Sequence, residues 1–278
     1  METMTSFFSE ICNTGITSIT EELPYWSTPS GLEIMNSVQL KPNLKVLDTG
    51  SGSGYQMIEL AQRLGNSSMV FGMEQEDEIL ERIIQISEKY QLNNIEAIKG
   101  NIDRLPFGDH YFDLIVSNIG IRNIDNFDLF FEECKRVAKP TAQLIISLHL
   151  QDAIMEFYNA MEEVLKSQNM LYEIETMKEH IHSRYKSLKS VEHILHSAGF
   201  LISEIKLHKF SMTFLDGTTF FNHRLIRNVF LPEWTTLFEK KVHKDIFKAI
   251  ELKINHLSSS ANGFKISVPY AVLNCICT

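Results

Sequence analysis

Glycine spacing in the first quarter of the 278-residue chain indicates a ligand that is held by main-chain groups. Gly50, Gly52 and Gly54 alternate with serines just after Asp48. Glycine lets a backbone turn sharply and approach a ligand closely, and the helix predicted to follow offers free N–H groups. Glu74 lies 24 positions after Gly50, where a carboxylate can accept hydrogen bonds from both hydroxyls of a ribose. The pattern therefore predicts a ligand that contains ribose.

The spacing of the same glycines separates two classes of nucleoside ligand. Dinucleotide-binding proteins carry G-x-G-x-x-G/A, and the third small residue falls at position 55 when counted from Gly50 and Gly52. Tyr55 occupies that position, which argues against a pyrophosphate beside the ribose. An NAD(P)-dependent oxidoreductase stays as the alternative, because it shares the fold and the ribose carboxylate. Taken singly, Asp48 would also suit a loop cap, and Glu74 would also suit a helix N-terminus.

Short β-branched runs alternate with stretches whose apolar residues recur at helical spacing, which is typical of βαβ units around a parallel sheet. Gly65 and Pro140 mark the ends of two predicted helices. After the fifth strand the alternation weakens, and residues 211–262 are rich in aromatics with a helical period. The fold class expected from this order is α/β. The predicted strands are 45–48, 69–74, 95–99, 112–118, 143–150, 200–210 and 264–275.

Three segments resemble, in order and spacing, those of class I S-adenosylmethionine-dependent methyltransferases. Asp48–Gly54 matches D/E-x-G-x-G-x-G, Gly100–Phe107 resembles G-D-A-x-x-L-P-F, and Phe112–Asn118 resembles F-D-x-V-x-S-N. The likeness covers roughly residues 40 to 150 and 186 to 210, in the manner of the ubiquinone and menaquinone C-methyltransferases and many small-molecule methyltransferases. It implies a doubly wound, Rossmann-like seven-stranded sheet of order 3-2-1-4-5-7-6, with the last strand antiparallel and with helical lid insertions.

The resemblance also implies a site for the cofactor S-adenosyl-L-methionine. The glycine loop would surround its amino-acid portion, and Glu74 would hold the ribose. Asn101 replaces the family's Asp and would accept from the adenine amino group, since an amide oxygen still accepts that bond, while the Ile102 N–H would donate to the ring. Asn118 would reach the methionine portion through its backbone carbonyl. The residues assigned to the cofactor are Asp48, Gly50, Ser51, Gly52, Glu74, Gln75, Asn101, Ile102, Asn118 and Tyr25.

The same likeness predicts how the rest of the chain is organised. Residues 1–40 are expected to form a helical segment that closes over the cofactor, with Tyr25 and Trp26 either covering the site or simply packing. Residues 41–278 would form the methyltransferase domain, with helical insertions at about 151–185 and 211–262. Because loops at the carboxyl ends of strands line the crevice of doubly wound folds, we expect these insertions to form an apolar pocket.

Methyl transfer from a sulfonium depends mainly on holding the nucleophile and the methyl carbon in line, roughly 3 to 3.5 Å apart. His149 ends the fifth predicted strand and is the candidate base or orienting group, with a structural imidazole as the alternative. His223, Arg224 and Arg227 would suit either an anionic acceptor or a solvated helical face. The predicted activity is methyl transfer (EC 2.1.1.-) to a small, hydrophobic or aromatic acceptor. A non-catalytic protein that binds S-adenosylmethionine is a further alternative.

Composition limits the partners. The formal net charge is −9, from 26 basic and 35 acidic side chains without a basic stripe, so we expect no nucleic acid partner. No signal-like N-terminus and no run of roughly 18 apolar residues stands in the sequence, which predicts a cytoplasmic protein without a membrane span. Cys275 and Cys277 are expected to be core thiols, since no second pair or histidine cluster accompanies them. The partners that remain are the small acceptor and a second copy in a homodimer.

Overall fold

The computed structural model describes residues 25–118 and 126–278, so residues 1–24 of the predicted N-terminal segment lie outside the description. The described chain divides into two compact units. We call the one that holds residues 25–150, 186–208 and 270–278 the sheet unit, and the one that holds residues 151–185 and 209–269 the helical unit. Two long strands, β6 (Phe200–Phe214) and β7 (Phe264–Cys277), contribute residues to both.

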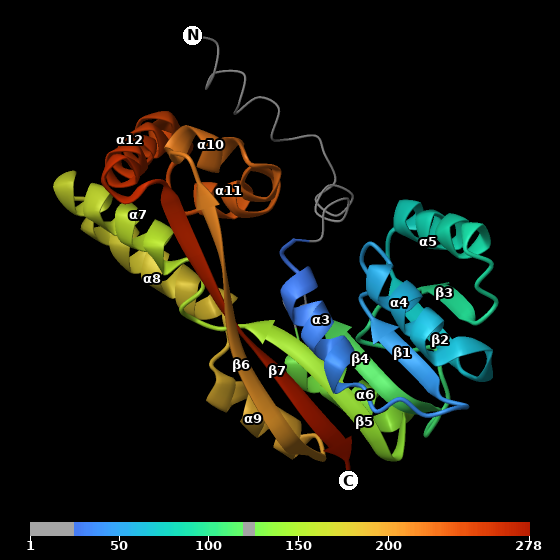
Figure 1. Ribbon diagram of the computed structural model, residues 1–278. Helices are drawn as coiled ribbons and strands as arrows, with labels where there is room; N and C mark the ends of the chain where they lie inside the picture. The colour runs from blue at the N-terminus through green and yellow to red at the C-terminus, as the bar shows by residue number, and fades with distance from the viewer. Residues whose placement is uncertain (1–24, 119–125) are drawn as a thin grey trace. The chain divides into compact units, whose positions relative to one another are not determined.

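Seven strands form one sheet of order β3-β2-β1-β4-β5-β7-β6, as Figure 1 shows. The first five pair in parallel, whereas β7 pairs antiparallel with β5. The predicted α/β class, the strand order and the antiparallel last strand are therefore confirmed. The first five strands are β1 (Lys45–Thr49), β2 (Met69–Glu74), β3 (Ile95–Lys99), β4 (Phe112–Asn118) and β5 (Ala138–His149).

Helices pack on both faces of this sheet. Figure 1 shows α3 and α4 in front of the strands and α6 behind them. The core behind the sheet includes Phe130, Phe131 and Cys134, together with Cys275 and Cys277 of β7, so the two cysteines are core thiols as predicted. The helices of the sheet unit are α3 (Thr28–Ser37), α4 (Tyr55–Leu64), α5 (Asp77–Lys89), α6 (Phe127–Val137) and α9 (Leu188–Ser197), with a 3-10 turn η1 (Gly65–Ser67).

The helical unit has an aromatic core of its own. The Phe157 ring stacks on Trp234 with a centroid separation of 3.7 Å and on Phe220 at 5.4 Å. The Trp234 indole N–H donates to the buried hydroxyl of Tyr158 at 3.2 Å. These aromatic side chains of the predicted insertions therefore contact one another. The helices here are α7 (Met155–Ser167), α8 (Leu171–Arg184), α10 (Gly217–Asn222), the π-helical η3 (Ile226–Phe230), α11 (Leu231–Thr235), the 3-10 turn η4 (Lys240–Val242) and α12 (His243–Ala261).

No helix within residues 25–118 and 126–278 has the length and apolar character needed to cross a lipid bilayer.

The start of the fifth strand differs from the prediction. Pro140 was expected to end the preceding helix, with a strand from residue 143, but α6 ends at Val137 and β5 begins at once at Ala138. The register between β4 and β5 shifts between Phe112 and Leu114, and such an irregularity accommodates a proline within a strand. Strands β6 and β7 also extend further than predicted, to Phe214 and Cys277.

Thr141 adopts a left-handed conformation, with φ of 64°. Because a β-branched residue is strained there and this side chain is exposed, we expect Thr141→Gly to raise the free energy of unfolding by about 0.5 to 1 kcal/mol, after the added entropy of glycine in the unfolded chain is subtracted. Urea denaturation measures this change. Asn43, also exposed and left-handed at φ 61°, is the control, because asparagine tolerates that region and Asn43→Gly gains less. A loss of stability in Thr141→Gly would contradict the strain.

Candidate functional site

The loop between β1 and α4 is built on three glycines in the left-handed region. Gly50, Gly52 and Gly54 have φ of 76°, 50° and 78°, which L side chains rarely adopt. The loop lies against the end of β2, because the N–H groups of Gly50 and Ser51 donate to the Met73 carbonyl at 3.2 and 3.1 Å. The loop backbone is thus fixed at the carboxyl edge of the sheet, where ligands of doubly wound folds bind.

Glu74 joins this loop to the chain that follows β2. Its Oε2 accepts from the Gly52 N–H at 3.1 Å, and its Oε1 accepts from the Gln75 N–H at 2.7 Å. An ionised carboxylate has about four acceptor positions on its two oxygens. Each oxygen of Glu74 therefore has a position left for a further donor, as a pair of ribose hydroxyls requires.

Asp48 is buried beneath the loop at 1% exposure. Its Oδ1 accepts from the Gln56 amide at 3.4 Å, and its Oδ2 has no hydrogen-bond partner within the described part of the chain. Burial raises the pKa of Asp48 from 3.8 to about 7; the Ser51 hydroxyl lowers it in part and the charge of Glu74 adds to the rise. An acceptor without a donor in this place is free to bind a cationic or N–H group of a ligand.

Asn118 is the centre of a second polar cluster at the same edge. Its Oδ1 accepts from the hydroxyls of Ser30 and Ser147, both at 2.7 Å. Its Nδ2 donates to the Ser27 carbonyl at 3.0 Å and to the Tyr55 hydroxyl at 3.2 Å. The side chain of Asn118 therefore ties α3 to β4, β5 and α4, whereas sequence reasoning gave this residue only a backbone role.

Tyr55 links the glycine loop to α3. It is the first residue of α4, and its hydroxyl donates to the Ser27 carbonyl at 3.4 Å. A Cβ atom on Gly31 would lie 1.6 Å from the Tyr55 hydroxyl, so only glycine at position 31 lets the phenol reach the α3 backbone. Burial, with the nearby charge of Asp48, raises the pKa of Tyr55, so the phenol stays a neutral donor.

Asn101 follows β3, the strand whose last residue, Lys99, pairs with Glu74 at the end of β2. The Gly100 N–H donates to the Glu74 carbonyl at 3.0 Å. Asn101 itself is exposed, and its Oδ1 accepts from the Asp103 N–H at 3.1 Å, which leaves one lone pair of the amide oxygen for a ligand. Ile102 is partly buried and packs against the core behind the sheet.

His149 lies at the end of β5 at 6% exposure, with its ring edge-on to Trp26 at a centroid distance of 4.7 Å. It lies two residues after Ser147, so both side chains point to one face of the strand, the face on which Ser147 contacts Asn118. Tyr25 is 67% exposed. The roles predicted for His149 and Tyr25 stay predictions.

Hydrogen bonds bring together the predicted residues of the loop, Glu74, Gln75 and the chain at Asn101, and they connect Asn118 to the helix that follows the loop. His223, Arg224 and Arg227 belong to the helical unit. Burial lowers the pKa of His223, which makes it a poor partner for an anion. No group of His, Cys, Asp or Glu suited to a metal ion occurs among the described residues.

Sequence reasoning missed Ser27, Ser30 and Ser147, which partner Asn118. Single serines carry no motif, and Ser27, just before α3, and Ser30, on α3, are some 90 residues from Asn118 in the chain. The one available signal was the period of two that places Ser147 and His149 on the same face of a strand.

Comparison with known proteins gives one family. A family model described as a methyltransferase domain matches residues 40–206. A demethylmenaquinone methyltransferase of Bacillus cereus is 33% identical over 113 residues, which cover 41% of this chain and 48% of the relative. The chain thus matches about half the length of this curated relative.

Solved structures show the same fold. The YcgJ protein of Bacillus subtilis superposes with a TM-score of 0.60 at 15% identity, over 89% of this chain and 97% of that one. A putative methyltransferase of Bacillus halodurans gives a TM-score of 0.57 at 19% identity, over 90% and 100% of the two chains.

The raised pKa of Asp48 predicts a specific pH dependence of stability. Between about pH 4 and pH 7 the folded protein keeps a proton on Asp48 that the unfolded chain has lost. Stability that is present at pH 4 is therefore lost as the pH rises through 7, with a slope of at most about 1.4 kcal/mol per pH unit from this group. Asp48→Asn cannot titrate, so the variant should lack this part of the slope.

Urea denaturation of wild type and Asp48→Asn from pH 4 to pH 8 measures the free energy of unfolding of each. Subtracting one profile from the other removes the contributions of the histidines that both proteins share. Glu59→Gln, which alters an exposed carboxylate paired with Arg63, is the control and should follow the wild-type profile in this range. Parallel profiles of wild type and Asp48→Asn would show that burial does not raise the Asp48 pKa.

Proposed function

We propose, on the premise that the chain belongs to the methyltransferase domain family, that it binds S-adenosyl-L-methionine and transfers the methyl group to a small acceptor. The observation that carries the proposal is the arrangement of three left-handed glycines with two differently placed carboxyl groups. Glu74 is partly exposed and accepts from backbone N–H groups, whereas Asp48 is buried with one oxygen unpartnered among the described residues.

The residues present fit this cofactor. Asp48 Oδ2 is a buried acceptor that suits the ammonium group of an amino-acid portion, and Glu74 keeps acceptor positions for both ribose hydroxyls. Asn101, next along the sheet edge, keeps a lone pair for the adenine amino group, and the Ile102 N–H would donate to the ring. The backbone of residues 50–52 would border the amino-acid portion, and the Asn118 carbonyl would face the methionine portion.

When bound, the cofactor supplies a methyl group already activated by a sulfonium. The protein then needs to hold the acceptor in line with that carbon and exclude water, which accounts for much of the rate in such transfers. Asn118 and Tyr55 hold α3 at the sheet edge through their hydrogen bonds. We propose that His149, on the same strand face as Ser147, orients the acceptor or accepts its proton.

The acceptor we propose is small and hydrophobic or aromatic. Support comes from the curated relative, whose name gives demethylmenaquinone as its substrate. That residues 151–185 and 211–262 form a lid that selects the acceptor, and that residues 1–40 close over the cofactor, are also proposals. A test of the lid has to change exposed side chains, because Phe157, Phe220 and Trp234 fill the core of the helical unit. The cytoplasmic location, the lack of a nucleic acid partner and the homodimer stay predictions.

The nicotinamide-dependent alternative is less favoured. The dinucleotide-binding fingerprint has a small third residue, which lets its helix pack closely on the strand. Here Tyr55 stands in that place and its hydroxyl is engaged by Ser27 and Asn118. A non-catalytic protein would share the cofactor site and differ only in lacking an acceptor.

Calorimetry tests the cofactor directly. We expect S-adenosylmethionine and S-adenosylhomocysteine to bind, and NAD⁺ and NADP⁺ to give no heat. Glu74→Ala should weaken binding of S-adenosylhomocysteine by about 100-fold, because it removes two hydrogen bonds to a charged acceptor. Glu78→Ala, four residues along at the start of α5, is the matched control and should bind as wild type does. Binding of NAD⁺ in preference to both adenosyl ligands would sink the proposal.

Turnover tests the role of His149. With radiolabelled S-adenosylmethionine and a panel of naphthols, hydroquinones and phenols, we expect at least one acceptor to be methylated. His149→Gln should then lower kcat by about 100-fold or more, with the affinity for S-adenosylhomocysteine unchanged. His196→Gln, on the exposed end of α9, should not change kcat. A variant with normal kcat and lower stability would make His149 a packing residue, and cofactor binding without any methylation would favour the non-catalytic alternative.

A further inference from the structure

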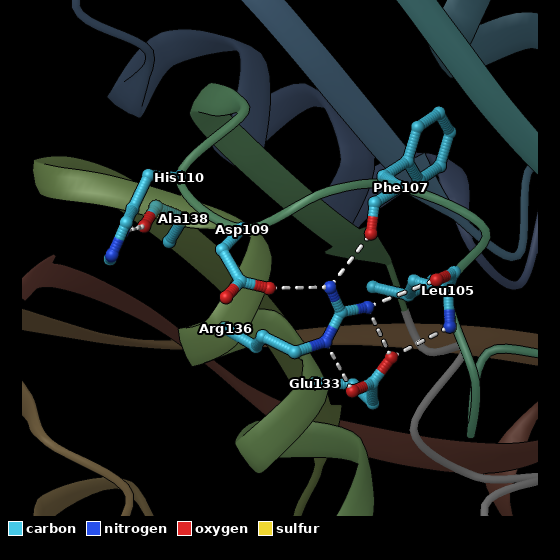
Figure 2. Close-up of polar contacts among 7 residues, drawn as sticks. All are labelled: Leu105, Phe107, Asp109, His110, Glu133, Arg136 and Ala138. Carbon is cyan, nitrogen blue, oxygen red and sulfur yellow. Dashed lines mark hydrogen bonds and ion pairs between the residues drawn. The ribbon is translucent and has the colours of Figure 1, made fainter.

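We propose that Arg136 and Glu133 of α6 position the adenine-binding loop, defined as residues 100–111, and thereby set cofactor affinity and adenine selectivity without contacting the cofactor. This inference rests on the proposed function, because it takes adenine to be the group bound at Asn101 and Ile102. The two residues carry no assigned role, and the hydrogen bonds that connect them to the loop are drawn in Figure 2.

The loop has little regular structure of its own. Its twelve residues connect β3 to β4 in turns and bends. Near its start, the Gly100 N–H donates to the Glu74 carbonyl and the Arg104 N–H donates to the Asn101 carbonyl at 3.3 Å. Leu105, at 3% exposure, is its buried anchor in the core behind the sheet. The backbone groups around this anchor therefore need partners from elsewhere.

Arg136 supplies them with a complete set of donors. Its Nη2 donates to the Leu105 carbonyl at 3.0 Å, and its Nη1 donates to the Phe107 carbonyl at 2.7 Å and to Asp109 at 3.0 Å. The remaining two N–H groups, on Nε and Nη2, form a bidentate pair with Glu133, both at 2.7 Å. All five guanidinium donors are thus used, an arrangement that lysine with its three donors on one atom cannot reproduce.

Glu133 holds the loop and the arginine at once. Its Oε2 accepts from the Leu105 N–H at 2.8 Å as well as from Arg136. The side chain is 16% exposed, and its hydrogen bond with Arg136 lowers its pKa. Leu105 therefore has its N–H bound by the carboxylate and its carbonyl bound by the guanidinium, so that both members of the pair are needed to fix this residue.

The other end of the loop is attached at the same place. The His110 N–H donates to the Arg136 carbonyl at 2.9 Å, and the Tyr111 N–H donates to the Val137 carbonyl at 2.7 Å. The Phe107 ring stacks on Tyr111 with a centroid distance of 5.8 Å. Residues 105–111 are thus held by the last turn of α6. The turn that carries Asn101 and Ile102 lies between this support and the hydrogen bond of Gly100 to the Glu74 carbonyl, so Leu105 fixes one of its two ends.

The first measurement uses the protein without cofactor, so that it does not depend on the proposed ligand. Hydrogen exchange of the Leu105 and Tyr111 amides, followed by mass spectrometry, should be faster in Arg136→Lys than in wild type by about 10-fold or more. Lys139→Gln is the matched control, because the Lys139 and Asp113 pair, at 2.7 Å, is a similar partly exposed ion pair that does not contact the loop. It should leave exchange in residues 100–111 unchanged.

The second measurement tests cofactor selectivity. Arg136→Lys and Glu133→Gln should each bind S-adenosylhomocysteine about 10- to 100-fold more weakly than wild type. Both should also lose part of the preference for it over S-inosylhomocysteine, whose base lacks the amino group. A general loss of stability would weaken both ligands equally and keep that ratio. If Arg136→Lys does not fold, Asp109→Asn removes a single exposed contact and should give the same changes in smaller size.

The outcomes are distinct. If wild type binds neither ligand, the proposed function fails, while the exchange result still decides whether the pair holds the loop. If wild type binds and the variants show wild-type affinity, selectivity and amide protection, the positioning role is wrong. An unchanged ligand ratio with faster exchange also overturns it, since the loop would then be held by the pair without setting how adenine is recognised.

Discussion

A carboxyl group at 1% exposure gives up nearly all of its hydration, and this free-energy cost is offset only where donors reach it. At Asp48 the Gln56 amide donates a long hydrogen bond to Oδ1, the Ser51 hydroxyl lowers the pKa only in part, and Oδ2 has no hydrogen-bond partner among the described residues. The burial is imposed by close packing, since a Cβ atom on Gly72 of β2 would lie 2.4 Å from Ser51 Oγ and from Met57 Sδ. The loop lies tightly on β2, and the carboxyl group beneath it keeps an open acceptor position at Oδ2 among the described residues.

The hydrogen bonds on the two sides of that loop differ in how far apart their partners lie along the chain. On one side the Glu74 carboxylate accepts from the N–H groups of Gly52 in the loop and Gln75 after β2, and the more distant of these two residues is 22 positions away along the chain. On the other side Asn118 and Tyr55 reach Ser27 and Ser30 of α3. The first set of contacts involves the β1–α4–β2 unit, whereas the second joins α3 to β4, β5 and α4.

These distances in sequence also explain what could be predicted. The period of the apolar residues, the glycine spacing and the acidic residue 24 positions after Gly50 are local signals. They predicted the strands, the α/β fold class and the two carboxyl groups of the site, Asp48 and Glu74. The strand order came from the resemblance. Arg136 reaches Leu105 and Phe107 through their main-chain carbonyls, which any sequence at 105 and 107 would offer, so no residue pattern at these two positions identifies the contact. The prediction that Pro140 ends a helix was wrong for a related reason. The place of Pro140 in β5 depends on the shifted register with β4, and the residues next to it in the sequence do not show this.

The aromatic residues of the insertions show where composition is ambiguous. A high density of Phe and Trp indicates equally a pocket for an apolar acceptor and a core for a small helical unit, since both need large apolar surfaces. In this chain Phe157, Phe220 and Trp234 are fully buried against one another, and that contact uses the faces that an aromatic ligand would stack on. Side chains outside this stack would therefore have to recognise the proposed acceptor. The residues proposed to bind the cofactor are independent of that question, because the hydrogen bonds that join Asp48, Glu74 and Asn118 to their partners in the described chain lie within the sheet unit.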